Sequence, residues 1–171
     1  MLSCELLKFQ YALQLWQLSV TMNSMKIYLD VCCLNRPFDD QTQDRIHLEA
    51  EAILAVLNYS RMSGWSVIGS DAIDFEIGRM PDHDKRLKVQ ILSTLHDVYV
   101  KADAGVERRA MELKQVGLKA LDALHVSCAE RAKAEVFLTT DDHLLSKAVQ
   151  NKKILKVRIE NPLRWVTEVL K

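Results

Sequence analysis

The sequence predicts an α/β protein, a three-layer α/β/α sandwich around a central, mainly parallel sheet. Short apolar runs alternate along the chain with longer segments of helical periodicity, the order typical of a parallel sheet covered by helices. Three of these runs end in acid, at Asp30, Asp71 and Asp141. The 171 residues suffice for one domain with a buried core.

The first half of the chain begins with a predicted strand at residues 26–29, followed by a polar loop at 35–40 that Pro37 keeps from regular structure. A helix is expected at 44–61, a strand at 65–69 and a helix from Asp71 onward. The inner face of the first long helix is predicted from its apolar spacing. Its members are Ile46, Ala50, Ile53, Leu54 and Leu57.

The second half continues the alternation. Strands are expected at residues 97–100, 135–139 and 155–158. Helices are expected at residues 84–95, 104–115, 119–133 and 142–150, and from Pro162 to the end. Asn161 is a suitable cap for the last helix, since Pro162 fits its first position.

Residues 1–24 form a separate segment, and residues 25–171 form the predicted domain. Apolar residues in the segment recur at steps of four and three and predict an amphipathic helix. They are Leu2, Leu6, Phe9, Leu13, Trp16 and Val20. The helix either docks on the domain or a partner, or precedes a natural start at Met25, which we favour. Polar residues interrupt it, so we expect no membrane span or signal peptide.

Charge is balanced overall, with 23 basic and 23 acidic residues, so no global field attracts nucleic acid. Basic residues gather only near the C-terminus, where they either bind a polyanion or form a solvated surface. They are Lys147, Lys152, Lys153, Lys156, Arg158, Arg164 and Lys171. The four cysteines show no disulfide or zinc spacing, which favours a reducing cytoplasm.

Acidic residues lie where ligands bind in open α/β folds, beyond the carboxyl ends of the strands. Asp30 and Asp141 each follow a strand, although either could simply cap a turn. Carboxylates gathered at one edge repel one another unless a cation lies among them. The pattern therefore predicts a metal site and, with it, phosphate chemistry.

Two further acids lie on predicted helices. Glu76 follows the second strand, where Asp71 or Asp74 could take its place. Asp122 lies in an apolar helix, where an unpaired buried carboxylate is costly unless it pairs with Lys119. The next helix, after Asp141, is expected to be capped by Asp142, and Asp71 is expected to be a cap as well.

These residues resemble the motifs of PIN-domain nucleases. The resemblance rests on Tyr28-Leu29-Asp30, Glu76, Leu121-Asp122-Ala123-Leu124-His125 and Leu138-Thr139-Thr140-Asp141, in that order, and it covers residues 25–171. One departure is Cys32, which stands where the family often has Asn or Ser. This departure bears on a supporting hydrogen bond and not on the ligand set.

The resemblance implies a ribonuclease that uses Mg²⁺ or Mn²⁺ to hydrolyse single-stranded RNA. Its catalytic and metal-binding acids would be Asp30, Glu76, Asp122 and Asp141, with Asp30 and Asp122 as direct ligands. Thr139 would support the last acid, and Glu49 and Glu51 are lesser competitors for the place of Glu76. His125 is expected to be a packed helix residue.

The same resemblance implies a biological setting. Many single-domain members are VapC-type toxins that act as homodimers and are held inactive by a small antitoxin. A free-standing RNA-processing nuclease and a non-catalytic interaction module are the alternatives. A phosphatase of the haloacid dehalogenase type would need a second Asp at position 32, where this chain has Cys32.

Overall fold

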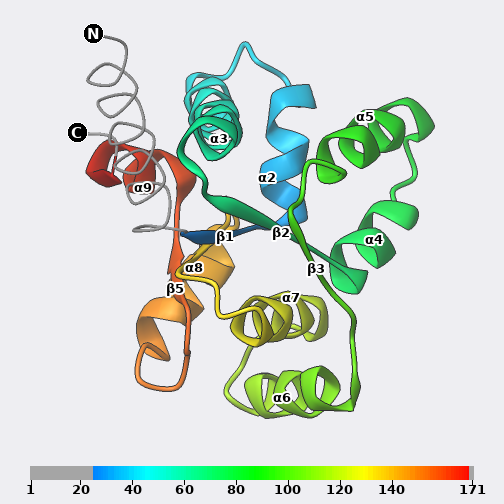
Figure 1. Cartoon of the computed structure of the whole chain (residues 1–171), viewed down its shortest axis with the longest axis vertical. Coiled ribbons are helices and arrows are strands. Elements are labelled where there is room, and N and C mark those ends of the chain that lie inside the picture. Colours follow the sequence, from blue (N-terminus) through cyan, green and yellow to red (C-terminus); the bar gives the residue numbers. More distant parts are fainter. Residues whose placement is uncertain (1–24, 170–171) are drawn as a thin grey trace, which may run out of the picture.

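Five parallel strands form one sheet in the order β3-β2-β1-β4-β5, which confirms the predicted fold class (Figure 1). The structure is a computed structural model that describes residues 25–169. The strands are β1 (Lys26–Leu29), β2 (Ser66–Ser70), β3 (Val98–Val100), β4 (Val136–Leu138) and β5 (Arg158–Glu160). The helices are α2 (Val31–Asn35), the 3₁₀ helix η1 (Arg36–Phe38), α3 (Asp44–Ser63), α4 (Asp71–Gly78), α5 (His83–Ser93), α6 (Ala104–Gln115), α7 (Ala120–Arg131), α8 (Asp142–Gln150) and α9 (Pro162–Val169).

Strand β1 lies at the centre of the sheet. This position explains why its sequence is apolar without alternation. Ile27 pairs with Val67 of β2 on one side and with Val136 of β4 on the other. Helices cover both faces, so both sets of side chains are buried. The ring of Tyr28 stacks on Phe137 of β4, with ring centroids 5.0 Å apart.

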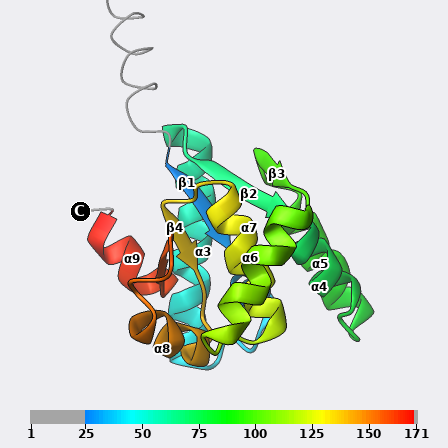
Figure 2. The same cartoon turned by 90° about the horizontal axis from the view of Figure 1, so that it is seen from below.

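The helices form two layers. Helices α2, α3, α5 and α9 lie on one side of the sheet, and α6, α7 and α8 lie on the other (Figure 1). Helices α6 and α7 pack side by side in both views (Figures 1 and 2). Helix α4 contacts α2, α5 and α7 and so links the two layers at one end of the sheet.

Two predictions about the layer above β1 are wrong. The expected polar loop at 35–40 is replaced in part by α2 and η1, and Pro37 occupies the first turn of η1, where a missing N–H costs nothing. On α3, Leu54 is 43% exposed, whereas Val56, which was not predicted, is fully buried.

The last strand and two helix caps also differ from prediction. Strand β5 begins at Arg158, at the end of the predicted range 155–158. Helix α4 is capped by Ser70 rather than Asp71, and α8 is capped by Asp141 rather than Asp142. Asn161 does cap α9, since it accepts a hydrogen bond from the backbone N–H of Leu163.

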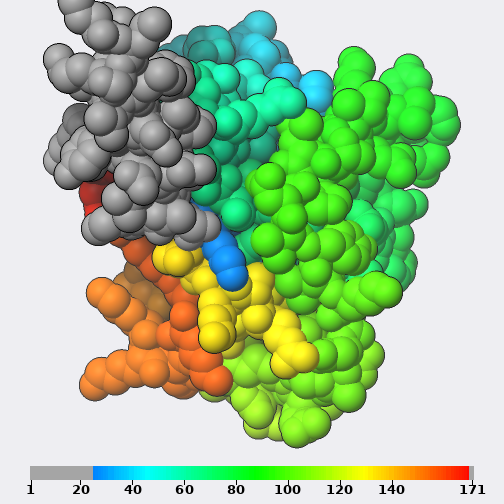
Figure 3. Space-filling model, viewed as in Figure 1, coloured from blue at the N-terminus to red at the C-terminus, as the bar shows by residue number. Residues whose placement is uncertain are grey.

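The loop between α8 and β5 projects from the body and carries part of the basic segment (orange, lower left of Figure 3). Within residues 25–169, no helix is long and apolar enough to cross a membrane. The predicted amphipathic segment 1–24 lies outside the described residues.

Candidate active site

Three central strands, β1, β2 and β4, each pass almost directly into a helix at the same edge of the sheet. The junctions are formed by Asp30, Ser70 and Asp141, and each of these side chains accepts a hydrogen bond from a backbone N–H of the helix it begins. Capping of this kind fixes where the chain turns and therefore where the side chains project. The acids near these junctions are thus held by the local fold.

Asp30 is buried, and each of its carboxylate oxygens accepts a hydrogen bond. Its Oδ1 accepts a hydrogen bond from the backbone N–H of Val31 at 2.8 Å. Its Oδ2 accepts one from the hydroxyl of Thr139 at 2.7 Å, across the boundary between β1 and β4. Thr139 therefore orients Asp30, while its Oγ1 also accepts a hydrogen bond from the backbone N–H of Asp141 at 3.1 Å.

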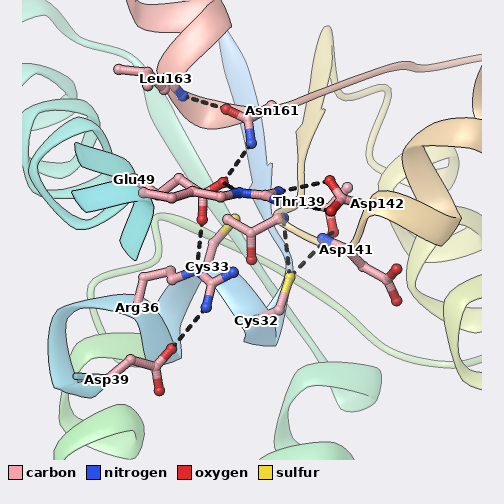
Figure 4. Close-up of polar contacts among 12 residues, drawn as sticks. Cys32, Cys33, Arg36, Asp39, Glu49, Thr139, Asp141, Asp142, Asn161 and Leu163 are labelled. Carbon is pink, nitrogen blue, oxygen red and sulfur yellow. Dashed lines mark hydrogen bonds and ion pairs between the residues drawn. The ribbon is translucent and has the colours of Figure 1, made fainter. Parts of the chain in front are cut away.

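Cys32 takes part in the same network despite its departure from the family pattern. Its Sγ lies 3.2 Å from Asp30 Oδ2. It also lies 3.2 Å from Thr139 Oγ1 (Figure 4), and it accepts a hydrogen bond from the backbone N–H of Thr140 at 3.3 Å. A thiol is a weak donor and a weak acceptor. The supporting hydrogen bond that the departure brought into question is therefore made by sulfur.

Glu76 is held by a buried chain of polar groups. Its Oε2 lies 2.7 Å from His125 Nε2, and His125 Nδ1 lies 2.8 Å from the hydroxyl of Tyr28. That hydroxyl lies 2.7 Å from Ser70 Oγ, which accepts a hydrogen bond from the backbone N–H of Ile73. We call Ser70, Tyr28, His125 and Glu76 the polar relay.

The polar relay has a consistent direction. Burial raises the pKa of Tyr28 well above its usual value, so the phenol keeps its proton. Because Ser70 Oγ already accepts from a backbone N–H, its own proton can go to Tyr28, the phenol proton to His125 Nδ1, and the Nε2 proton to Glu76. In this arrangement His125 donates to Glu76 and accepts from Tyr28.

One ligand atom each from Asp30, Glu76 and His125 lies within 4.8 Å of the others, forming the acidic cluster. His125 is buried, as predicted, but its contact with Glu76 was not predicted. His125 lies three residues after Asp122, so both lie on one face of α7, and this spacing was the available sign that His125 belongs to the site.

Asp122 lies beside this cluster and has an unpaired oxygen. Its Oδ2 is buried without a hydrogen-bond partner among the described residues. The pKa of Asp122 is raised, mainly by burial and next by the negative charge of Asp30. The charge of Asp141 raises it less strongly, and the positive charge of Lys119 lowers it. The predicted alternative partner Lys119 instead lies 3.6 Å from Asp141 Oδ2.

Asp141 has two roles at the edge of the site. Its Oδ1 caps α8 by accepting hydrogen bonds from the backbone N–H groups of His143 and Leu144. Its side chain is 34% exposed, and Oδ2 faces Lys119. Asp141 can therefore face a ligand with one oxygen only.

Glu49, one competitor for the place of Glu76, is engaged elsewhere. Its carboxylate is almost fully buried and accepts hydrogen bonds from Arg36 at 2.7 Å, Arg45 at 3.0 Å and Asn161 at 2.9 Å (Figure 4). Arg45 also forms a two-bond pair with Asp142. These contacts join α3, α8 and α9, and both oxygens of Glu49 are engaged by an arginine or an amide.

Asp71 and Asp74 are engaged too. The hydroxyl of Tyr99 lies 2.8 Å from Asp71 Oδ1 and 2.6 Å from Asp74 Oδ2, so the two carboxylates share its one proton. Asp71 also accepts a hydrogen bond from the backbone N–H of Ala102. Glu76 is therefore the acid of α4 that faces the cluster.

The PIN domain family matches residues 27–150, which span the whole cluster. The chain belongs to the PIN domain family. Among solved structures, this PIN domain is similar to VapBC2 from Rickettsia felis bound to a DNA fragment from its promoter, with a TM-score of 0.54 and 16% identity over 80% of this chain and 98% of that one. It is also similar to FitAcB from Neisseria gonorrhoeae, with a TM-score of 0.55 and 16% identity over 80% and 97% of the two chains. No curated protein matches its sequence.

The residues of this PIN domain fit a hard divalent cation. Carboxylate oxygens are the ligands that Mg²⁺ and Mn²⁺ prefer. The buried Asp122 oxygen without a partner is what such a cation would satisfy. His125 Nε2 is already hydrogen-bonded to Glu76. We therefore expect this nitrogen to orient Glu76 and not to bind the cation itself.

Proposed function

We propose that this PIN domain is a metal-dependent ribonuclease that hydrolyses phosphodiester bonds of single-stranded RNA. The observation that carries the proposal is the unpaired, buried oxygen of Asp122, beside Asp30 and Asp141. Leaving a carboxylate in this state costs free energy unless a positive charge compensates it. Membership of the PIN domain family supports nuclease chemistry at this place.

Asp30 and Asp122 would bind Mg²⁺ or Mn²⁺ directly, and Glu76 and Asp141 would complete the catalytic set. When bound, the cation supplies a water of lowered pKa and positive charge for the phosphate that is cleaved. Thr139 holds Asp30 in place through its 2.7 Å hydrogen bond.

The chain's own residues contribute orientation and charge around this set. The polar relay holds Glu76 in one position, because His125 is itself held by Tyr28. Lys119 is 59% exposed beside Asp141 and can contact a substrate phosphate at the rim.

We place this nuclease in a toxin–antitoxin pair, as a homodimer controlled by a small antitoxin. The similarity in fold to VapBC2 and FitAcB supports this setting. We further propose that residues 25–171 form the nuclease domain, with 1–24 as an extension. Expression of the active protein should arrest growth, and coexpression of a small neighbouring protein should relieve the arrest. Growth that is unaffected by the active enzyme would contradict the setting.

The activity is tested by cleavage of a single-stranded RNA with Mg²⁺, with Mn²⁺ and with excess chelator. We expect cleavage only with a metal, and a loss of more than about 100-fold in Asp30→Asn and Asp122→Asn, because groups that merely support ligands are already worth 10–100-fold. Asp84→Asn is the matched control, since that side chain is 93% exposed. Activity that survives both substitutions, or chelation, would refute the assignment.

A further inference from the structure

A mostly apolar groove of about 580 Å³ opens directly beside the acidic cluster. Phe75, Glu76 and Arg79 of the α4 segment form one wall, and Leu121 and Leu124 of α7 form the other. Ordinary surface leucines and phenylalanines need no explanation when they are scattered, but a concave apolar site next to reactive groups is a typical binding site.

The groove is continuous with the proposed catalytic set. Glu76 belongs both to the groove wall and to the acidic cluster, and Leu121 directly precedes Asp122. A strand whose phosphate lies at the cluster can therefore place an adjacent nucleotide at the mouth of the groove.

The α4 wall carries an aromatic ring and a cation together. The side chain of Phe75 is 54% exposed, and the guanidinium carbon of Arg79 lies 5.3 Å from the centre of its ring. Among the described residues, Arg79 has no ion pair of its own. Aromatic rings and arginine planes stack on unpaired bases of any sequence, and arginine also binds phosphate.

We propose that this groove binds one unpaired base of the RNA strand, next to the phosphate that is cleaved. The base stacks on Phe75, and Arg79 contacts a neighbouring phosphate. This inference rests on the proposed function. Charge favours nucleic acid as the occupant, because Arg79 is a cation without an ion pair among the described residues and an RNA strand brings a phosphate with every base.

The test measures steady-state cleavage of a single-stranded RNA oligonucleotide by the full chain and by Phe75→Ala and Phe75→Trp. We expect Phe75→Ala to raise KM by about 5- to 150-fold, the range for loss of one stacked base, with kcat within about twofold. Phe75→Trp should keep a KM near that of the wild type, since it retains a stacking surface.

Substrate lacking one base identifies the position that the groove binds. Removal of the base at one position beside the cleaved phosphate should raise KM for the wild type and have no further effect in Phe75→Ala. Tyr59→Ala is the matched control, since Tyr59 is 42% exposed and packs on Trp65, which precedes the amino end of β2, far from the strand ends that form the site. Its KM should stay unchanged.

The remaining outcomes separate the two proposals. An unchanged KM in Phe75→Ala, with the wild type cleaving RNA, would overturn the groove proposal alone. A change of oligomeric state in Phe75→Ala, seen by sedimentation, would make the groove an interface between copies and would also overturn it. Failure of the wild type to bind or cleave any RNA would overturn the proposed function together with this inference.

Discussion

Replacing Asp122 with Asn should stabilise the metal-free protein while it removes activity. The wild-type carboxylate has a buried oxygen without a partner and lies near the like charges of Asp30 and Asp141. The neutral amide of Asn removes the buried negative charge and its repulsion from Asp30 and Asp141, and an unpaired buried group costs more free energy when it is charged than the roughly 1–3 kcal/mol of a neutral one. Because Asp122 is only half-buried, we expect a gain of about 1 kcal/mol, or about 2–4 °C in Tm.

In the presence of Mg²⁺ the wild type should be more stable than Asp122→Asn. At about 100 times the Kd of Mg²⁺, binding adds about 2.7 kcal/mol to the stability of the wild type. The Asp122→Asn variant should gain much less, since it lacks a ligand. Urea unfolding in chelator and in Mg²⁺ measures both effects, and Asp84→Asn should stay within about 0.5 kcal/mol of the wild type in each.

The pH dependence gives an independent check. The pKa of Asp122 is raised in the folded state, so the folded protein holds this proton more tightly than the unfolded chain does. Ionisation of Asp122 therefore opposes folding as pH rises, and the advantage of Asp122→Asn in chelator should shrink as pH falls towards about 4. A variant that is less stable than the wild type in chelator, or equally stabilised by Mg²⁺, would refute the reasoning.

Two further substitutions test the surroundings of the site. Tyr28→Phe keeps the stacked ring but removes the hydroxyl between Ser70 and His125, so we expect kcat to fall about 10-fold and more Mg²⁺ to be needed, with KM for RNA unchanged. A Mg²⁺ titration that leaves kcat and the midpoint as in the wild type would show that the polar relay does not position Glu76. Glu49→Gln removes the charge that two arginines share, and urea unfolding should show a loss of about 3 kcal/mol. A loss below about 1 kcal/mol, or one matched by the exposed control Glu51→Gln, would contradict that role.

The sequence predicted the ends of β1 and β4 well because their signal is local. Strands β1 and β4 are short apolar runs followed by polar residues that can cap a helix, and this pattern correctly placed Asp30 and Asp141 at the carboxyl edge. Which acid caps α8 was wrong by one position, because Asp141 and Asp142 are chemically equivalent in the sequence and only backbone geometry separates them.

Contacts between distant residues could not be predicted. His125 and Glu76 lie 49 positions apart, and the spacing of His125 from Asp122 indicates a shared face of α7 but not a contact with Glu76. The same holds for Glu49 and Asn161, which are 112 positions apart. Helix α2 was missed for a different reason, since five residues are too few to show a helical period.

The central position of β1 has a consequence for synthesis. Its two partners differ in when they become available, since β2 is made soon after β1 but β4 begins only at Val136. A growing chain therefore carries Asp30 and Glu76 long before Asp122 and Asp141, and one edge of β1 stays unpaired until then. The proposed nuclease would thus remain unassembled on the ribosome until β4 and Asp141 have been made.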